Sequence, residues 1–436
     1  MTGELTALGG VLRDMAALRA RRWVGAHVRH DPVARLHTRA GIADPYPIYA
    51  ELRGRGAFVR LRTGDRATAR YDCCRQVLRS RDFGVRMPGD RGPVEPSADL
   101  QMDLGMVERD PPDHTRLRRL AAPAFTPRGI DRHRRLVETT ADGLLDRAAA
   151  AGRFDLVAGY AAPLPVTVIT ALLGLDRQDA ASLAAHGAAI TSALDGLRSP
   201  SHLRAVVRAA NALQPAFERL VEQRRREPRD DLISALVAAE DDGRLTAYEL
   251  FVMCHLLLIA GFETTVNLIG NAVCALLDRP DLWAAVHDDP GLARGVVEEV
   301  LRYDPPVQST YRVAHRETEV GGERFGPGDG VLVLLGGAGR DPAAYPDPDR
   351  VDPHRPRAAE HLAFSAGIHY CLGAPLARLE AEVAVGRLAE RMPGLRRAGR
   401  GSWRPATTIR GYASLPVRAV EGGRVSGGSR RAAPRP

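Results

Sequence analysis

The sequence reads Phe364-Ser-Ala-Gly-Ile-His-Tyr-Cys371-Leu-Gly373-Ala-Pro375 where a helix is expected to begin. Glycines on both sides of the cysteine let the backbone come close to a large, flat group. Free backbone N–H groups and the dipole at a helix start both stabilise a thiolate. A lone cysteine is usually inert and buried, but the pattern Phe-x-x-Gly-x-His-x-Cys-x-Gly favours a ligand-binding role for Cys371.

The longest predicted helix begins at Thr246-Ala-Tyr-Glu249, a capping box whose hydroxyl and carboxylate satisfy the first free backbone N–H groups. It continues to Asp278, where Arg279-Pro280 ends it. That span is about 32 residues, or roughly 48 Å of helix. A helix so long and so apolar is expected to cross the interior of the molecule.

In the middle of this helix, Ala260-Gly261-Phe-Glu263-Thr264-Thr interrupts the apolar run with a glycine and an acid–alcohol pair. A buried charge is costly unless it serves a function or finds a partner. The alternative is a threonine that hydrogen-bonds to its own helix beside a surface glutamate. We favour a functional role for the pair.

Two further charged pairs have helical spacing. Glu299 and Arg302 are three residues apart, which places acid and base on one helical face. His114 and Arg118 follow Asp110-Pro-Pro and are four residues apart, so they also share a face. Paired cations of this kind suit carboxylates.

These motifs, with Arg340-Asp-Pro and the following Tyr345-Pro-Asp-Pro-Asp-Arg350, stand in the order that they have in cytochromes P-450. By this resemblance the chain is identified as a member of that family, of the bacterial, actinobacterial type, from about residue 40 to Val417. The resemblance implies a mainly α fold with small β-sheets and a long central helix that crosses a haem.

The resemblance also implies haem b as the cofactor and O2 as co-substrate, with Cys371 as the axial ligand of the iron. Glu263 would relay protons, and Thr264 would hydrogen-bond the bound dioxygen. His114, Arg118, Arg312 and His369 would bind the haem propionates. The full implied set of cofactor-binding residues is His114, Arg118, Ala260, Arg312, Phe364, His369, Cys371 and Gly373.

Three residues are expected to form a structural network beneath the haem: Glu299, Arg302 and Arg350, with Arg355 as the less favoured third member. The residues expected to line the substrate pocket are Leu257, Gly261, Val307 and Gln308. The haem loop departs from the family's pattern at Ser365, where a glycine is usual. This departure puts the local geometry of the loop in doubt.

The activity that the resemblance implies is a monooxygenase that hydroxylates or epoxidises a small, largely apolar molecule, in secondary metabolism. Electrons would come from a ferredoxin and a ferredoxin reductase. One alternative is a peroxide-driven peroxygenase, which normally lacks the acid–alcohol pair. Another is a non-catalytic recruitment module, which usually loses the thiolate cysteine.

Composition and charge exclude several other classes of protein. The net charge is +8, yet all 61 basic residues are arginines interspersed with acids, without the basic run that nucleic-acid binding requires. Five cysteines are too few and too scattered for a disulfide framework. No apolar signal core or bilayer-length apolar run is present. We therefore expect a cytoplasmic monomer that binds neither nucleic acid nor membrane.

Other elements are predicted more coarsely. Residues 114–300 are expected to be almost entirely helical, short strands are expected at 56–71, 310–335 and 403–417, and a last helix runs from just after Cys371 to about Met392. The Gly/Pro-rich loop at 84–107 is long enough to be a lid or binding segment. The predicted organisation is an Arg-rich segment at 1–40, one domain at 41–420 and a disordered tail at 421–436.

Overall fold

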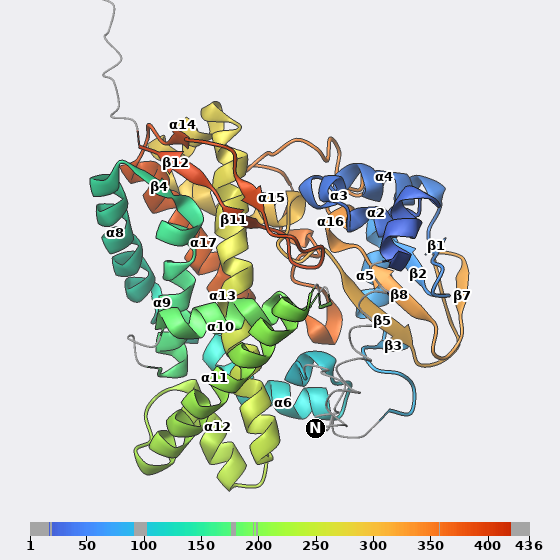
Figure 1. Ribbon diagram of the computed structural model, residues 1–436, viewed down its shortest axis with the longest axis horizontal. Coiled ribbons are helices and arrows are strands. Elements are labelled where there is room, and N and C mark those ends of the chain that lie inside the picture. The colour runs from blue at the N-terminus through green and yellow to red at the C-terminus, as the bar shows by residue number, and fades with distance from the viewer. Residues whose placement is uncertain are drawn as a thin grey trace, which may run out of the picture.

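The computed structural model describes residue 17 and residues 20–90, 103–175, 180–194, 196–197, 199–356 and 358–419. Helices dominate this part of the chain, and the short strands lie mostly at one side of them, with a smaller group at the opposite side (Figure 1). The α-helices are α2 (Pro32–Leu36), α3 (Arg39–Ala43), α4 (Tyr46–Arg55), α5 (Tyr71–Arg79), α6 (Asp113–Ala121), α7 (Pro127–Asp131), α8 (Arg134–Ala151), α9 (Pro163–Leu173), α10 (Ala180–Thr191), α11 (Pro200–Arg226), α12 (Leu232–Asp241), α13 (Ala247–Leu277), α14 (Pro280–Asp288), α15 (Ala293–Tyr303), α16 (Leu335–Ala338) and α17 (Ala374–Arg391).

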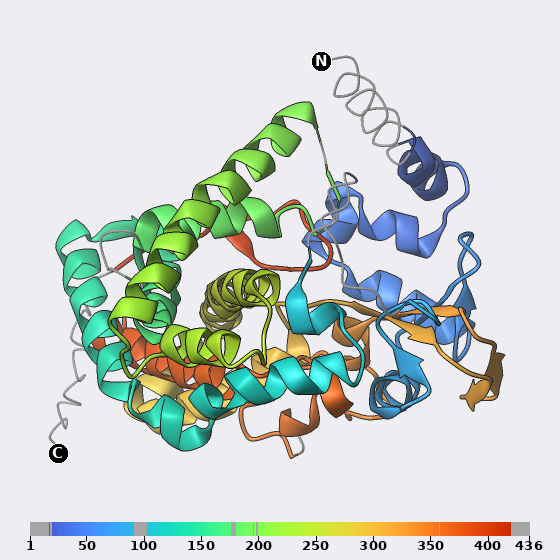
Figure 2. The same cartoon turned by 90° about the horizontal axis from the view of Figure 1, so that it is seen from below.

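Helix α13 is the central element, and its ends agree with the sequence prediction. Thr246 is its N-cap and forms the expected capping box with Glu249, and Asp278 is its C-cap. The helix has 31 residues, most of them buried. Figure 2 shows it nearly end-on, surrounded by other helices. Within the described residues it is the one helix apolar and long enough to cross a bilayer, but 78% of its most apolar window is buried in the protein, as in a core helix.

The strands form four small sheets. A five-stranded sheet has the order β1 (Val59–Arg60), β2 (Arg66–Thr68), β8 (Gly330–Val333), β5 (Thr310–Ala314), β3 (Phe83–Gly84), and only its β2–β8 pair is parallel. The others are antiparallel: β6 (Thr318–Val320) with β7 (Glu323–Phe325), β10 (Ser402–Trp403) with β11 (Tyr412–Ser414), and β4 (Arg153–Asp155), β12 (Pro416–Arg418) and β9 (Arg396–Arg397) in that order.

The hydrophobic core packs α13 and α17 against each other. The largest buried cluster combines apolar residues of α8, α9, α13, α15 and α17, and α13 packs directly against α9, α15 and α17. A second cluster lies between α5 and the five-stranded sheet. Cys371 comes just before α17, and α13 lies across the cavity from Cys371. The packed core therefore holds both helices in place around the cysteine.

The predicted elements are largely confirmed. The described residues between 114 and 300 are mostly helical, with turns between the helices and one strand, β4, which pairs with β12 near the end of the described chain. Such a three-residue strand carries too weak a local signal, because its pairing partner is more than 250 residues away. The prediction for residues 421–436 lies outside the described residues, as does the 91–102 part of the loop at 84–107. The division into one domain with two terminal segments stays a prediction.

Candidate active site

A cavity of about 580 Å³ lies between α13 and the segment that carries Cys371. That volume is within the usual range of ligand pockets, roughly 300–1,000 Å³. All eight residues expected to bind the cofactor line it, although they come from four separate segments of the chain. They are His114, Arg118, Ala260, Arg312, Phe364, His369, Cys371 and Gly373.

Cys371 sits between a short 3-10 turn (Gly367–His369) and the start of α17. Its backbone N–H donates to the carbonyl of Phe364 at 2.9 Å, which closes the loop, and its thiol is accessible from the cavity. Burial raises the pKa of the Cys371 thiol, although the backbone N–H of Gly373 and the charge of Arg118 act to lower it. A coordinated metal cation deprotonates such a thiol outright.

Four basic side chains gather at one edge of the cavity: His114, Arg118, Arg312 and His369. The imidazole rings of His114 and His369 have centroids 4.3 Å apart. Burial lowers the pKa of His369 to about 3, and the charges of Arg312, His114 and Arg118 lower it further. Burial likewise lowers the pKa of Arg312, to about 10. Asp110 acts electrostatically on His114 and Arg312, but among the described residues none of the four forms an ion pair with an acidic side chain.

The hydrogen bonds of these four basic side chains also leave polar atoms without acceptors or donors. Within the described chain, His114 Nδ1 and His369 Nε2 are buried without any hydrogen-bond partner. Arg312 donates only to Thr310 Oγ1, the Tyr311 carbonyl and, at 3.5 Å, Ser365 Oγ. Buried polar groups in proteins are nearly always paired. Two carboxylates at this edge would satisfy the cluster, so the residues present fit a haem with its propionates here and its iron at Cys371.

The wall opposite Cys371 comes from α13, through Leu257, Ala260, Gly261 and Thr264. Gly261 has a second role, because a Cβ atom there would lie 2.6 Å from Ile169 Cδ1 on α9. The glycine therefore permits close packing of α9 against α13 as well as an open cavity wall. Thr264 Oγ1 is 3.3 Å from the Ala260 carbonyl, so its hydroxyl bonds back to its own helix while it faces the cavity.

Glu263 differs from expectation, because its side chain does not line the cavity. It is 3% exposed and forms an ion pair with Arg404, whose Nη1 is 2.7 Å from Glu263 Oε1. Burial raises the pKa of Glu263, and Arg404 acts to lower it. Arg404 follows β10, about 140 residues away in the chain, so no local pattern could have identified it as the partner.

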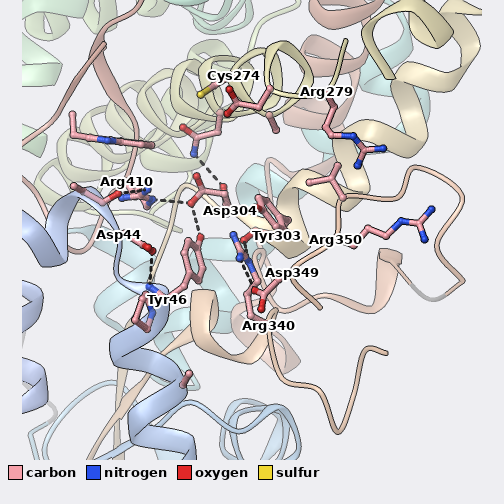
Figure 3. Close-up of a pocket in the computed structure, with 18 of the residues that line it drawn as sticks. Asp44, Tyr46, Cys274, Arg279, Tyr303, Asp304, Arg340, Asp349, Arg350 and Arg410 are labelled. Carbon is pink, nitrogen blue, oxygen red and sulfur yellow. Dashed lines mark hydrogen bonds and ion pairs between the residues drawn. The ribbon is translucent and has the colours of Figure 1, made fainter. Parts of the chain in front are cut away.

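A second cavity, of about 740 Å³, lies between α4, the end of α13 and β11 (Figure 3). Its charges are largely paired with one another: Arg340 with Asp349 at 2.7 Å, and Arg410 with Asp304 at 2.8 Å. The Arg340 guanidinium also lies between two aromatic rings of this cleft. Of the predicted site residues, only Arg350 lines it. The chemistry of this cleft is that of a satisfied polar interface.

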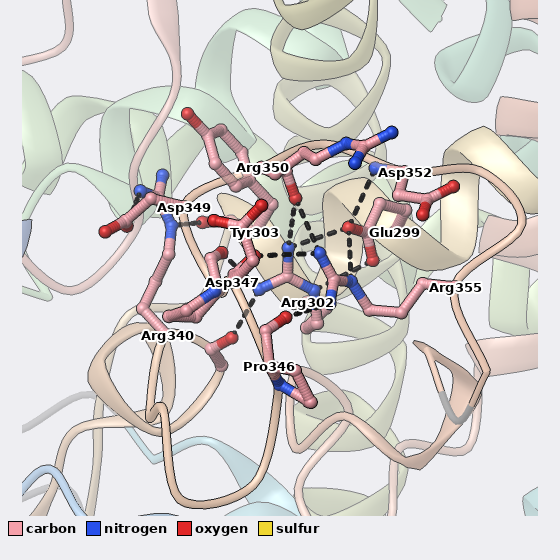
Figure 4. A network of polar contacts seen from close by, with 12 residues as sticks. Glu299, Arg302, Tyr303, Arg340, Pro346, Asp347, Asp349, Arg350, Asp352 and Arg355 are labelled. Atoms are coloured by element: carbon pink, nitrogen blue, oxygen red, sulfur yellow. Dashed lines mark hydrogen bonds and ion pairs between the residues drawn. The ribbon is translucent and has the colours of Figure 1, made fainter.

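The structural network contains Glu299 and Arg302 as predicted, but its third side chain is Arg355 and not Arg350 (Figure 4). Glu299 and Arg302 are fully buried, with Arg302 Nη2 at 2.7 Å from Glu299 Oε1. Arg355 Nε donates to the same oxygen at 2.9 Å. Arg350 contributes only its backbone carbonyl, which accepts from Arg302 and Arg355, while its side chain points away. The prediction of Arg350 was wrong because loop geometry decides which arginine turns inward.

The pocket prediction is correct for Leu257, Gly261 and Val307, which line the active-site cavity, and wrong for Gln308. Gln308 is 1% exposed; its Oε1 accepts from Tyr49 Oη at 3.0 Å and its Nε2 donates to the Pro305 carbonyl at 2.7 Å. Successive residues of an extended segment point to opposite sides. Val307 therefore faces the cavity, and Gln308 faces the packing contact with α4.

Ser365 has a backbone φ of 61°, in the left-handed region that favours glycine. This conformation explains why glycine is usual there, and it costs a non-glycine residue about 1–2 kcal/mol.

We expect Ser365→Gly to raise the free energy of unfolding of the haem-free protein by about 1 kcal/mol, because it relieves this strain. Urea denaturation measures the change. Ser80→Gly, at a residue with extended backbone, is the control and should not stabilise; a destabilised Ser365→Gly variant would mean that the hydroxyl contact to Arg312 outweighs the strain.

The cysteine in the cavity, the basic edge and the facing helix α13 fit a haem held by a thiolate, and known proteins show the family to which the chain belongs. The family model for cytochrome P450 matches residues 291–391. A putative cytochrome P450 140 of Mycobacterium tuberculosis is 40% identical over 429 residues, which cover 94% of this chain and 96% of that protein. The cytochrome P450 monooxygenase PikC of Streptomyces venezuelae is 43% identical over 388 residues, with 86% and 91% covered.

Solved structures lead to the same conclusion. The crystal structure of P450BioI with an acyl carrier protein ligated to hexadec-9Z-enoic acid superposes with a TM-score of 0.81 at 34% identity, and the match covers 87% of this chain and 98% of that one. The chain belongs to the cytochrome P450 family, and the predicted fold class is confirmed. It is an oxidoreductase of the P450 monooxygenase type, a family that uses haem and O2.

Proposed function

We propose that this enzyme inserts one oxygen atom from O2 into a small, largely apolar organic molecule, by hydroxylation or epoxidation, with haem b held on Cys371. The observation that carries the proposal is the mainly apolar cavity with its cysteine floor and its four basic groups without ion-pair partners. When bound, haem supplies the activation of O2 by two electrons and the transfer of one oxygen atom. The protein supplies ligation, orientation and protons.

Each residue of the cavity has a distinct task in this proposal. Cys371 would hold the iron through its thiolate, and the basic edge would hold the propionates of the cofactor. Thr264, whose hydroxyl faces the cavity, would donate a hydrogen bond into the cavity once it gives up its bond to the Ala260 carbonyl. Glu263 supplies protons only after its carboxylate leaves Arg404. The apolar lining of the cavity limits water, which would otherwise divert the reaction.

The electron source in this proposal is a ferredoxin with its reductase, and the enzyme acts as a cytoplasmic monomer in secondary metabolism. The scattered arginines of the chain suit an acidic protein partner. Support for secondary metabolism comes from a relative named 6-deoxyerythronolide B hydroxylase, from Saccharopolyspora erythraea, which is 42% identical over 318 residues.

The decisive test is the absorption spectrum of the purified, haem-loaded protein after reduction and binding of carbon monoxide. A thiolate-ligated haem is expected to show the red-shifted Soret band of the P450 type. Bound haem without that shift would overturn the proposal. Turnover with peroxide alone, and none with ferredoxin and its reductase, would instead indicate the peroxygenase alternative.

Thr264→Ala is expected to uncouple electron use from product formation, because the variant lacks the cavity-facing hydroxyl that would restrain O2 there. We expect at least about a fivefold fall in product formed per electron pair, with the P450-type carbon monoxide spectrum retained. The fivefold effect corresponds to about 1 kcal/mol, the scale of one hydrogen bond. Product and peroxide are measured against NADPH consumed. Thr167→Ala on α9, whose hydroxyl also bonds to its own helix, is the matched control, and equal coupling in both variants would refute the role of Thr264.

A further inference from the structure

Three polar residues form a buried stripe along one face of α13. Glu263, Asn267 and Asn271 follow one another at intervals of four residues, so their side chains succeed each other about every 6 Å along the helix. They are 3%, 1% and 2% exposed. Asparagine is a poor helix former, and a buried amide costs free energy unless it is hydrogen-bonded. Two of the three asparagines of the chain nevertheless lie on this stripe.

The amides of the stripe lack hydrogen-bond partners among the described residues. Both side-chain polar atoms of Asn267 are buried without a partner, and so is Oδ1 of Asn271. The β10–β11 hairpin faces them, since a Cβ atom on Gly411 would lie 2.1 Å from Asn267 Oδ1. On this hairpin, Arg404 pairs with Glu263 through Nη1, but its buried Nε has no partner. Buried polar atoms of this kind are usually bonded to ordered water, so four of them at one interface indicate a place that holds water.

The stripe connects the second cavity with the acid of the active site. At one end, Asn271 lines the second cavity, and its Nδ2 donates to the Asp304 carbonyl at 3.1 Å (Figure 3). That cavity reaches solvent, because Asp278, whose side chain is 63% exposed, also lines it. At the other end, Glu263 directly precedes Thr264, which lines the active-site cavity. The charges of the second cavity are paired, but the Asn271 oxygen in its wall is not.

We propose that Asn267 and Asn271 hold a chain of water molecules that carries protons from the second cavity to Glu263. The inference rests on the proposed function, in which Glu263 supplies protons, and it adds their source. The stripe spans about 12 Å of helix, a gap that water crosses in a few hydrogen bonds. Each proton that Glu263 gives up is replaced by one from solvent, so the carboxylate ends the cycle as it began. The amides donate and accept hydrogen bonds without changing their own charge, so they are positioning residues.

Asn267→Leu keeps the size of the side chain and removes both polar atoms, so it breaks the chain of water in the middle. Turnover of the haem-loaded enzyme, measured as NADPH and O2 consumed with ferredoxin and its reductase, is expected to fall at least about tenfold, because positioned proton transfer contributes about 10²–10⁴-fold. The ratio of turnover in H2O to that in D2O is expected to rise, since proton delivery becomes rate-limiting. Asn271→Leu should act in the same way. Asn211→Leu on α11, at the exposed third asparagine, is the matched control and should change neither quantity.

Two further measurements on the haem-loaded protein need no turnover. A crystal structure should show ordered water bonded to Asn267 and Asn271. Urea denaturation gives the free energy of unfolding of Asn267→Leu. At a dry interface leucine would raise this free energy, because it removes a buried amide without partners. At a hydrated interface the amide is already satisfied, so we expect the variant to lower it.

Unchanged turnover in Asn267→Leu would overturn the proposal. A loss of turnover without a change in the solvent isotope effect would show a purely structural role and overturn it too. A raised free energy of unfolding, or an interface without ordered water, would contradict it independently of turnover. The reduced carbon monoxide spectrum of each protein separates these outcomes from a failure of the proposed haem-thiolate function, since that spectrum depends on Cys371 and not on the asparagines.

Discussion

Replacing Cys371 with histidine is expected to lower monooxygenase turnover by at least about a hundredfold, or about 2.7 kcal/mol in the barrier. Imidazole can bind haem iron, so the cofactor is expected to stay in the cavity. The neutral ligand does not push electron density onto the iron as a thiolate does, and O–O cleavage depends on that push. The reduced carbon monoxide complex should therefore lose the P450-type Soret band while the haem content stays near that of the wild type.

Cys254→Ala is the matched control for this experiment. Cys254 is fully buried in α13, burial raises the pKa of its thiol to about 12, and it does not line the cavity. We expect this variant to keep both the Soret band and the turnover. If Cys371→His retained the P450-type band, another group would have to be the thiolate ligand, and the assignment of the site would be wrong.

The second large effect is expected at Arg355. Its side chain is 8% exposed and completes the pairing of a carboxylate, Glu299, that has no exposed surface. The Arg355→Ala variant leaves Glu299 paired with Arg302 but removes a buried hydrogen bond between charged groups, which contributes about 1.5–3 kcal/mol. Arg355→Ala should lower the free energy of unfolding by about that amount. Urea denaturation followed by circular dichroism measures it.

Arg350→Ala provides a direct contrast five residues away. The Arg350 side chain is exposed, and the network uses only its backbone carbonyl, which the alanine variant keeps. Exposed substitutions of this kind change stability by less than about 0.5 kcal/mol. A loss at Arg350 as large as that at Arg355 would contradict the assignment made from the structure.

Much of the fold followed from local patterns. The helix that became α13 could be delimited because Thr246 and Glu249 form a capping box and Arg279-Pro280 ends the run. Such signals act within one helical turn, so a sequence carries them without reference to the rest of the molecule. The strand β4 could not be found in this way, because its hydrogen bonds go to β12.

The residues of the candidate site also fall into those that a local motif predicts and those that depend on distant parts of the chain. Residues in contiguous motifs, such as Cys371 with Phe364 and His369, were placed at the cavity by the pattern itself and by its likeness to a family. Residues whose partners lie far along the chain were not. Gln308 was assigned to the pocket in error, because the direction of its side chain depends on packing with Tyr49. No sequence motif identified Glu108 as a residue of the cavity.

By itself, the sequence determined that a cysteine ligand begins one helix, that a long apolar helix with Glu263 and Thr264 lies opposite, and that basic residues accompany them. Only the tertiary structure decided that Arg404 holds Glu263 away from the cavity, that Arg355 and not Arg350 completes the buried network, and that Glu108 faces the ligand space. The reason is physical: caps and helical spacing are set by neighbours in the chain, whereas ion pairs and cavity walls depend on which loops fold back against them.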